Sequence, residues 1–190
     1  MLEFIVYHGT ASKNKLSIID NGFDISTSIE NEHWLGNGVY FFCDGVPPEP
    51  FIAAEKWVVV EAWDNEKYKN RYNKYVVLQS IIKVQPEYFL DLTSKDGLVI
   101  FNYLRDKYIE SLKKERIRLS NGNYKDGHII DDAISEHIFQ IDAVKNNFYI
   151  KLSRDERVQN AQFRTPNCTI IAVKNTNCIH STTIFKEDYL

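Results

Sequence analysis

LEFIVYHGT, residues 2–10, joins an apolar run to a short polar turn. The run up to Tyr7 is rich in residues that favour extended structure, so it predicts a buried strand. His8, Gly9 and Thr10 follow at the strand end, where a turn presents polar groups. We therefore expect the chemistry of this protein to lie at the end of its first strand.

The next segments alternate between helical and extended patterns. Ser12 is a suitable N-cap for a helix of about ten residues, and Asn21-Gly22 is a typical helix stop. GNGVYFFC, residues 36–43, places two glycines before a β-prone run and predicts a close backbone approach that leads into a strand. Prolines precede residues 51–63, whose apolar side chains recur at helical spacing and predict a second helix.

The rest of the chain mixes both patterns without an internal repeat or a linker. Apolar spacing predicts strands over 75–84, 88–92, 148–152 and 169–173, helices over 94–118 (ended by Gly122) and 127–145, and a polar loop over 153–168. This mixture predicts a single domain over residues 1–190. Its class is α+β, with segregated pairs of strands rather than a doubly wound sheet.

Composition excludes several classes of protein. Hydrophobic residues make up 44% and charged residues 26% of the chain, as in ordinary globular proteins. The net charge of −3 provides no whole-protein attraction to nucleic acid or to anionic membrane. No apolar run approaches the ~18 residues of a membrane span, and the three cysteines indicate neither a disulfide framework nor a metal site. We expect a cytoplasmic protein that binds no membrane and no metal.

Four motifs occur in a recognisable order: YHGT at 7–10, NGF at 21–23, GNGVYFF at 36–42, and Ala53-Ala54 followed by Trp57. In this order they resemble the catalytic domains of the ADP-ribosyltransferase superfamily, of the PARP-like, diphtheria-toxin-like His-Tyr type. The resemblance covers roughly residues 4–60. It implies a split mixed or antiparallel β-sheet core with flanking helices, and NAD⁺ as co-substrate.

The resemblance assigns the first motif to NAD⁺. It implies that His8 hydrogen-bonds the adenosine ribose and that the backbone of Gly9 holds the nicotinamide carboxamide, with Thr10 beside them. A residue without Cβ suits this task, since a flat amide can then approach the main chain closely.

Aromatic residues of the later motifs are assigned to the nicotinamide ring. The resemblance implies that Tyr40 and Trp57 sandwich the ring, and stacking between aromatic faces suits a cationic pyridinium. Ala54 stands where the family usually has a Ser that also holds the carboxamide. One contact to the nicotinamide therefore departs from the family pattern.

A third family position, often Glu, opens a late strand that best matches residues 169–174. Cys168 or Thr169 stands there instead, and the preceding acceptor-selecting loop carries Gln162, which we take as a candidate catalytic residue. Gln159 and Arg164 lie in the same loop. Loss of the Glu is associated in this family with loss of chain elongation, so the resemblance favours transfer of a single unit.

The function implied is that of a mono-ADP-ribosyltransferase, which moves ADP-ribose from NAD⁺ to a protein or nucleic-acid acceptor and releases nicotinamide. Small catalytic domains of this type often serve as bacterial toxins or effectors, which can have an antitoxin-like inhibitor. Two other enzymes stay open on the same fold, an NAD⁺ glycohydrolase and an RNA 2′-phosphotransferase-like enzyme. An inactive module that binds ADP-ribose or NAD⁺ is a further alternative.

Two charged clusters have ordinary structural explanations. A basic cluster closes the helix predicted over 94–118, where it complements the helix dipole or, alternatively, contacts nucleic acid: Lys113, Lys114, Arg116 and Arg118. An acidic cluster follows in the next predicted helix, where capping explains it: Asp131, Asp132 and Glu136.

Overall fold

A seven-stranded sheet forms the centre of the computed structural model, which describes residues 1–25, 34–119 and 126–190. Its strands lie in the order β6-β7-β8-β2-β1-β5-β9, and every pair is antiparallel except β6 with β7. The bounds are β1 (Leu2–Ala11), β2 (Val39–Cys43), β5 (Lys74–Val84), β6 (Phe89–Asp91), β7 (Ala143–Phe148), β8 (Cys168–Val173) and β9 (Ile179–Tyr189). The predicted α+β class is confirmed.

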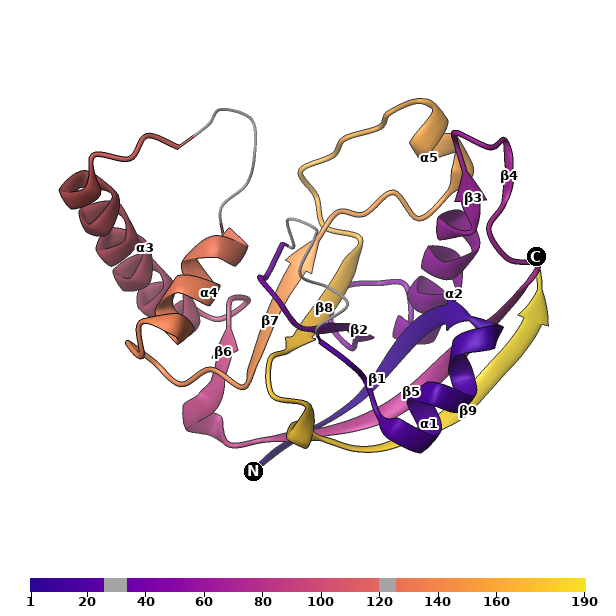
Figure 1. Cartoon of the computed structure of the whole chain (residues 1–190), viewed down its shortest axis with the longest axis horizontal. Coiled ribbons are helices and arrows are strands. Elements are labelled where there is room, and N and C mark those ends of the chain that lie inside the picture. The colour runs from indigo at the N-terminus through magenta and orange to yellow at the C-terminus, as the bar shows by residue number, and fades with distance from the viewer. Residues whose placement is uncertain (26–33, 120–125) are drawn as a thin grey trace.

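Helices lie around this sheet, and a two-stranded hairpin stands apart from it (Figure 1). The helices are α1 (Lys15–Asn21), α2 (Pro50–Glu61), α3 (Lys95–Glu115), α4 (Asp126–Ser135) and α5 (Arg154–Val158), and the hairpin pairs β3 (Trp63–Asp64) with β4 (Lys69–Asn70). Helix α2 packs on β1, β2 and β5. Figure 1 shows α3 and α4 together beyond β6, and α5 with the hairpin at the opposite end of the sheet.

Strands β2 and β8 are buried on both faces, which explains their continuous apolar sequences. Phe42 and Ile170 belong to the core on the face covered by α2, whereas Phe41 and Ile171 belong to the core on the other face. Side chains of a strand alternate between the two faces, so neighbouring residues stabilise different cores. The predicted strand over 169–173 is confirmed, with one more residue at its start.

The sheet is split between β1 and β2. Only two residue pairs join these strands, Val6 with Cys43 and Tyr7 with Phe42. Strand β1 continues to pair with β5 as far as Ala11, and β2 continues to pair with β8 as far as Val39. The two strands therefore separate just where the HGT sequence begins.

Several predicted helix boundaries are confirmed by local backbone chemistry, but Ser12 does not cap α1, which begins at Lys15 after a 3-10 turn over Ser12–Asn14. Gly22 ends α1 with a φ of 81°, a conformation that favours glycine. Pro50 begins α2, where its missing N–H leaves no hydrogen bond unmade. Ser94 caps α3 by accepting a hydrogen bond from the Gly97 N–H. The predicted extension of this helix to Arg118 and its end at Gly122 are wrong, because α3 ends at Glu115, where Arg116 takes a left-handed conformation with a φ of 58°. Gly122 itself lies outside the described residues.

The helix predicted over 127–145 is wrong in its second half. Helix α4 ends at Ser135, His137 has a φ of 53°, and β7 begins at Ala143. The apolar residues beyond Ser135 continue the helical spacing of α4. Residues 143–148 are nevertheless extended, because they pair with β6 on one side and with β8 on the other. The strand predicted over 148–152 accordingly lies earlier in the chain.

Three elements had no counterpart in the sequence prediction. Strand β9 is an edge strand with several charged side chains, and its pairing with β5 holds it in place. The short β3–β4 hairpin and α5 lie within segments read as connections. In the three described ranges, no helix combines the length and the apolar character needed to cross a membrane.

Candidate active site

A cavity of about 300 Å³ lies at the split between β1 and β2. It is lined by His8, Gly9, Trp34, Tyr40, Phe41, Phe42, Trp57, Ile150 and Ile170. Four residues that the resemblance assigns to NAD⁺ thus meet in one place: His8, Gly9, Tyr40 and Trp57. They come from β1, β2 and α2, and the split sheet brings them together.

The His8 side chain bridges the split. Its Nδ1 lies 2.8 Å from the Tyr40 carbonyl oxygen, which can only accept, so Nδ1 carries the proton. The neutral imidazole then keeps Nε2 as an acceptor. The edges of Phe23 and Phe41 pack against the ring at centroid distances of 5.2 and 5.7 Å. Burial lowers the pKa of His8 and favours this neutral form.

Protonation of His8 is expected to destabilise the fold. Below pH 6.5, its ordinary pKa, the unfolded chain takes up a proton that the folded protein binds less readily, so the free energy of unfolding falls with the pH. The slope is at most about 1.4 kcal/mol per pH unit. Urea unfolding between about pH 5 and pH 7 should show a shallower dependence in His8→Gln. The exposed His180, changed to Gln, serves as control, and equal slopes in wild type and His8→Gln would contradict a buried neutral imidazole.

Gly9 permits α2 to lie directly on β1. A Cβ at this position would stand 2.4 Å from the Ala54 carbonyl oxygen and 2.8 Å from the Val58 Cβ. Ala54, which the resemblance placed against the nicotinamide, is instead fully buried in the core. Its contribution to the cavity is indirect, because its close contact with β1 sets the distance between strand and helix.

Tyr40 holds the loop that precedes β2. Its hydroxyl donates to the Gly36 carbonyl and accepts from the Leu35 N–H, both at 2.8 Å. Burial raises the pKa of the phenol, so the hydroxyl stays protonated and can make both bonds. The ring therefore lines the cavity while its far end is fixed to the backbone.

An ion pair from distant parts of the chain secures the same loop. Asp131, on α4, accepts the Asn37 N–H with both carboxylate oxygens at 3.0 and 2.9 Å, and it pairs with Lys174 at 3.1 Å. Lys174 also donates to the Leu35 carbonyl at 2.5 Å, and its side chain is only 6% exposed. Sequence reasoning read Asp131 as an ordinary acid of a helix start, since nothing near it in the sequence indicates its partners.

Trp34 is a cavity residue that sequence reasoning missed. Its ring stacks on Phe148 at 5.3 Å and meets the edge of Trp57 at 6.4 Å. Trp57 also lies under the guanidinium of Arg157 at 5.4 Å. Together with Tyr40, Phe41 and Phe42, these two tryptophans bring the aromatic residues in the cavity lining to five, not counting His8.

Strand β8, which matches the late strand of the family, contributes an aliphatic side chain to the cavity instead of a carboxylate. Ile170 lines the cavity, whereas Cys168 and Thr169, the residues expected at this position, are buried elsewhere. Thr169 donates to the Asn147 side chain at 2.8 Å and accepts from the Val46 N–H at 2.7 Å. Burial raises the pKa of the Cys168 thiol to about 12. No carboxylate is among the described residues that line this cavity.

Gln162 and Thr10 lie outside this cavity. Gln162 is exposed and lines a second cavity of about 540 Å³, which shares Trp34, Trp57 and Ile150 with the first. The structure thus places the loop 153–168 beside the first cavity, with Gln162 next to it. Thr10 accepts a hydrogen bond from the Asn14 side chain at 3.0 Å, in the turn that follows β1.

Comparison with known proteins leaves the function open. No protein-family model matches this chain. The chain is 25% identical over 162 residues to an uncharacterized protein of Methanocaldococcus jannaschii, in an alignment that covers 83% of this chain and 70% of that relative. A functional conclusion therefore depends on the chemistry of the cavities.

Proposed function

We propose that this protein is an NAD⁺-dependent mono-ADP-ribosyltransferase. The observation that carries the proposal is the meeting of His8, Gly9, Tyr40 and Trp57 in one cavity at the split of the sheet. These residues lie far apart in the sequence, and the resemblance assigns all four of them to NAD⁺.

The chemistry of the cavity suits a nicotinamide ring. A volume of about 300 Å³ is at the small end of ligand pockets, as a single aromatic ring with its ribose requires. Tyr40, Trp34 and Trp57 supply ring faces, whose negative charge density attracts a cationic pyridinium. The acceptor nitrogen of a neutral His8 suits a ribose hydroxyl, which donates to it.

The proposed reaction proceeds by departure of nicotinamide. The bond between ribose C1′ and the pyridinium nitrogen breaks, and its electron pair neutralises the leaving nicotinamide. Aromatic faces then stabilise the cationic sugar while the apolar wall excludes water. Cys168 and Thr169 stand where the family often has Glu, and neither they nor Ile170, which lines the cavity, supplies a base for a further ribose hydroxyl. This supports transfer of one unit rather than polymer formation.

Nicotinamide release tests this proposal. Purified protein is incubated in cell lysate with NAD⁺ labelled in its adenosine half and, separately, in its nicotinamide. We expect release that falls about a hundredfold in His8→Ala and in Tyr40→Ala, because both changes disturb the positioning of the substrate. His180→Ala is the matched control, since this histidine is exposed on β9. Circular dichroism and thermal melting establish that each variant is folded.

The fate of the adenosine label separates the alternatives. Label retained in protein or nucleic acid supports a transferase. Release without retained label would replace the proposal with an NAD⁺ glycohydrolase, and binding without release would replace it with an inactive module. Failure to bind NAD⁺ at all would contradict the assignment of the cavity.

A further inference from the structure

Two further cavities continue from the candidate active site along α2. The second cavity, which holds Gln162, shares Trp34, Trp57 and Ile150 with the first. A third, of about 700 Å³, shares Asn65 and Arg157 with the second. We call the second and third cavities together the acceptor groove. They border α2, the β3–β4 hairpin and residues 149–163.

Aromatic rings recur along the acceptor groove. Trp34 and Trp57 stand at its inner end, where it meets the candidate active site. Tyr149 and Phe163 follow as an edge-to-face pair at 5.1 Å, and the Phe163 side chain is 63% exposed. Trp63 lies in the outer cavity. Trp34 and Phe163 are exposed and Trp57, Tyr149 and Trp63 half-buried, so aromatic rings reach the surface along the groove, as a ligand with several flat groups requires.

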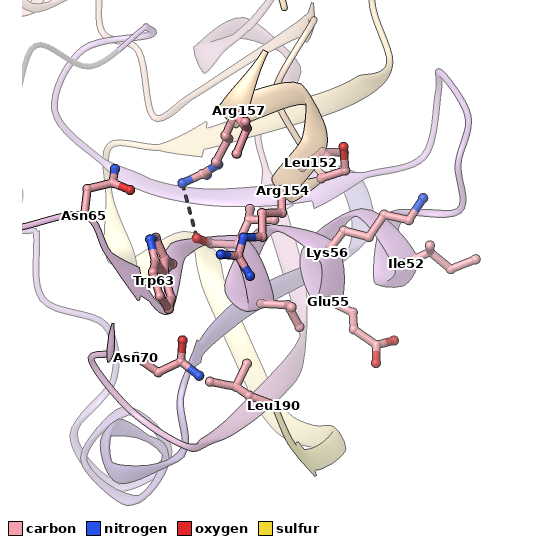
Figure 2. A pocket seen from close by; sticks show the side chains of 14 residues that line it. Ile52, Glu55, Lys56, Trp63, Asn65, Asn70, Leu152, Arg154, Arg157 and Leu190 are labelled. Atoms are coloured by element: carbon pink, nitrogen blue, oxygen red, sulfur yellow. Dashed lines mark hydrogen bonds between the residues drawn. The ribbon is translucent and has the colours of Figure 1, made fainter. Parts of the chain in front are cut away.

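Cations alternate with these rings. Lys151 lines the middle of the groove, and its ammonium donates to the neutral Asn160 side chain without pairing with a carboxylate of the described residues. Arg154 lies over the Trp63 ring at 4.8 Å, and Figure 2 shows its guanidinium beside that ring. Lys56 extends on the other side of the outer cavity (Figure 2). Among the described residues, no carboxylate pairs with Arg154 or Lys56.

The acidic residues of the groove are already neutralised. Glu61 pairs with Arg157 at 2.6 Å, an interaction that also ties α5 to α2. Glu55 pairs with Lys186 and accepts from the Tyr75 hydroxyl. The groove therefore has a local positive charge, although the whole chain has a net charge of −3.

We propose that the acceptor groove binds single-stranded nucleic acid and that a nucleotide of this strand is the ADP-ribose acceptor. Unpaired bases stack on aromatic side chains, and interleaved cations bind the phosphates between them. Stacking on Arg154 and Trp63 together extends the platform, since a guanidinium plane also accepts a base. A duplex offers no free base faces to such rings.

The inference rests on the proposed function and deepens it. A nitrogen or oxygen of the nucleotide at the inner end bonds to ribose C1′ as the bond to nicotinamide breaks. The electron pair of the broken bond stays with nicotinamide, and the acceptor atom gives its proton to water. Stacking on the rings of the acceptor groove sets the affinity for the strand, and it does not select a base, because the rings make no base-specific hydrogen bonds. Recognition of the reacting base therefore falls to the candidate active site.

Oligonucleotide binding tests the groove without any NAD⁺. Fluorescence anisotropy of labelled DNA and RNA strands of about twelve nucleotides is measured on the full chain over a range of salt concentrations. We expect Lys151→Glu/Arg154→Glu to weaken binding at least about tenfold and to make the slope of log K against log salt shallower by about 1.4. Phe163→Ala is expected to weaken binding about tenfold.

Matched controls come from α3, at the opposite end of the sheet (Figure 1). Lys113→Glu/Lys114→Glu makes the same charge change, and Tyr103→Ala removes a ring that is 48% exposed. Both are expected to bind like wild type. Equal or larger losses in these controls would overturn the groove as the binding site, and so would duplex binding as tight as single-strand binding.

The outcomes also separate this inference from the proposed function. Nicotinamide release from NAD⁺ that depends on His8, together with no affinity for single strands, would overturn the nucleic-acid acceptor and leave the transferase standing. Strand binding that depends on Lys151 and Arg154 supports the groove, even where NAD⁺ is not consumed. Label transferred to protein in lysate, with none in oligonucleotide, would likewise overturn the inference.

Discussion

Gly9→Ala is expected to lower the free energy of unfolding by about 3 kcal/mol and to abolish NAD⁺ use. A single methyl group would meet the Ala54 carbonyl oxygen at 2.4 Å and the Val58 Cβ at 2.8 Å. Both atoms belong to α2, a packed helix that cannot yield as a flexible side chain would. The helix must therefore move away from β1, and Trp57 moves with it. Thermal and urea unfolding, with NAD⁺ binding, measure the effect.

Gly22→Ala is the control for Gly9→Ala. Gly22 combines a φ of 81° with a ψ of −178°, a backbone conformation that essentially only glycine adopts, but it has open space around its missing Cβ. Alanine there is expected to cost about 1–3 kcal/mol of backbone strain without displacing a neighbouring element. NAD⁺ binding should be unchanged, because α1 contributes no residue to the cavity lining. A Gly9→Ala protein that binds NAD⁺ as well as Gly22→Ala does would contradict the close contact between β1 and α2.

Asp131→Ala is expected to lower the free energy of unfolding by about 3 kcal/mol, because the Lys174 ammonium is then left buried without its partner. The Asn37 N–H also loses its acceptor, so the loop that carries Tyr40 loosens. Burial already lowers the pKa of Lys174, so loss of the carboxylate favours the neutral amine still further. Urea unfolding measures the change in stability, and NAD⁺ titration measures the loosened loop.

Two variants show whether the ion pair is responsible. Asp132→Ala removes the neighbouring carboxylate of α4, which has no cation partner among the described residues, and should unfold like wild type. Lys174→Met in the Asp131→Ala protein removes the unpaired charge, so the double variant is expected to be more stable than Asp131→Ala alone. A double variant that is less stable by the sum of both single changes would show that the two residues act independently.

The two halves of the candidate site differ in how far sequence could predict them. His8, Gly9, Tyr40 and Trp57 stand in short motifs with a recognisable order, and all four line the cavity. Trp34 and Ile170 stand in no motif and were missed. Ala54 was misplaced, because the spacing along α2 does not tell which residue of that helix faces the cavity and which faces the core.

The sequence by itself determined those helices and strands whose signals lie within their own residues. Apolar spacing and helix signals were enough for α2, α3, β5 and β8, since a proline, a capping serine or a β-branched run acts through its own backbone. The sequence also identified HGT, residues 8–10, and Tyr40 as parts of recognisable motifs.

Only the tertiary structure decided where residues far apart in the chain meet. Pairing with β6 and β8 turned 143–148 from helix to strand, and pairing with β5 made 179–189 a strand despite its charges. The same non-local contacts open the split between β1 and β2 and bring Lys174 to Asp131. Hydrogen bonds between strands and the burial of an ion pair depend on partners that local sequence does not name, so the cavity and its groove become visible only in the folded chain.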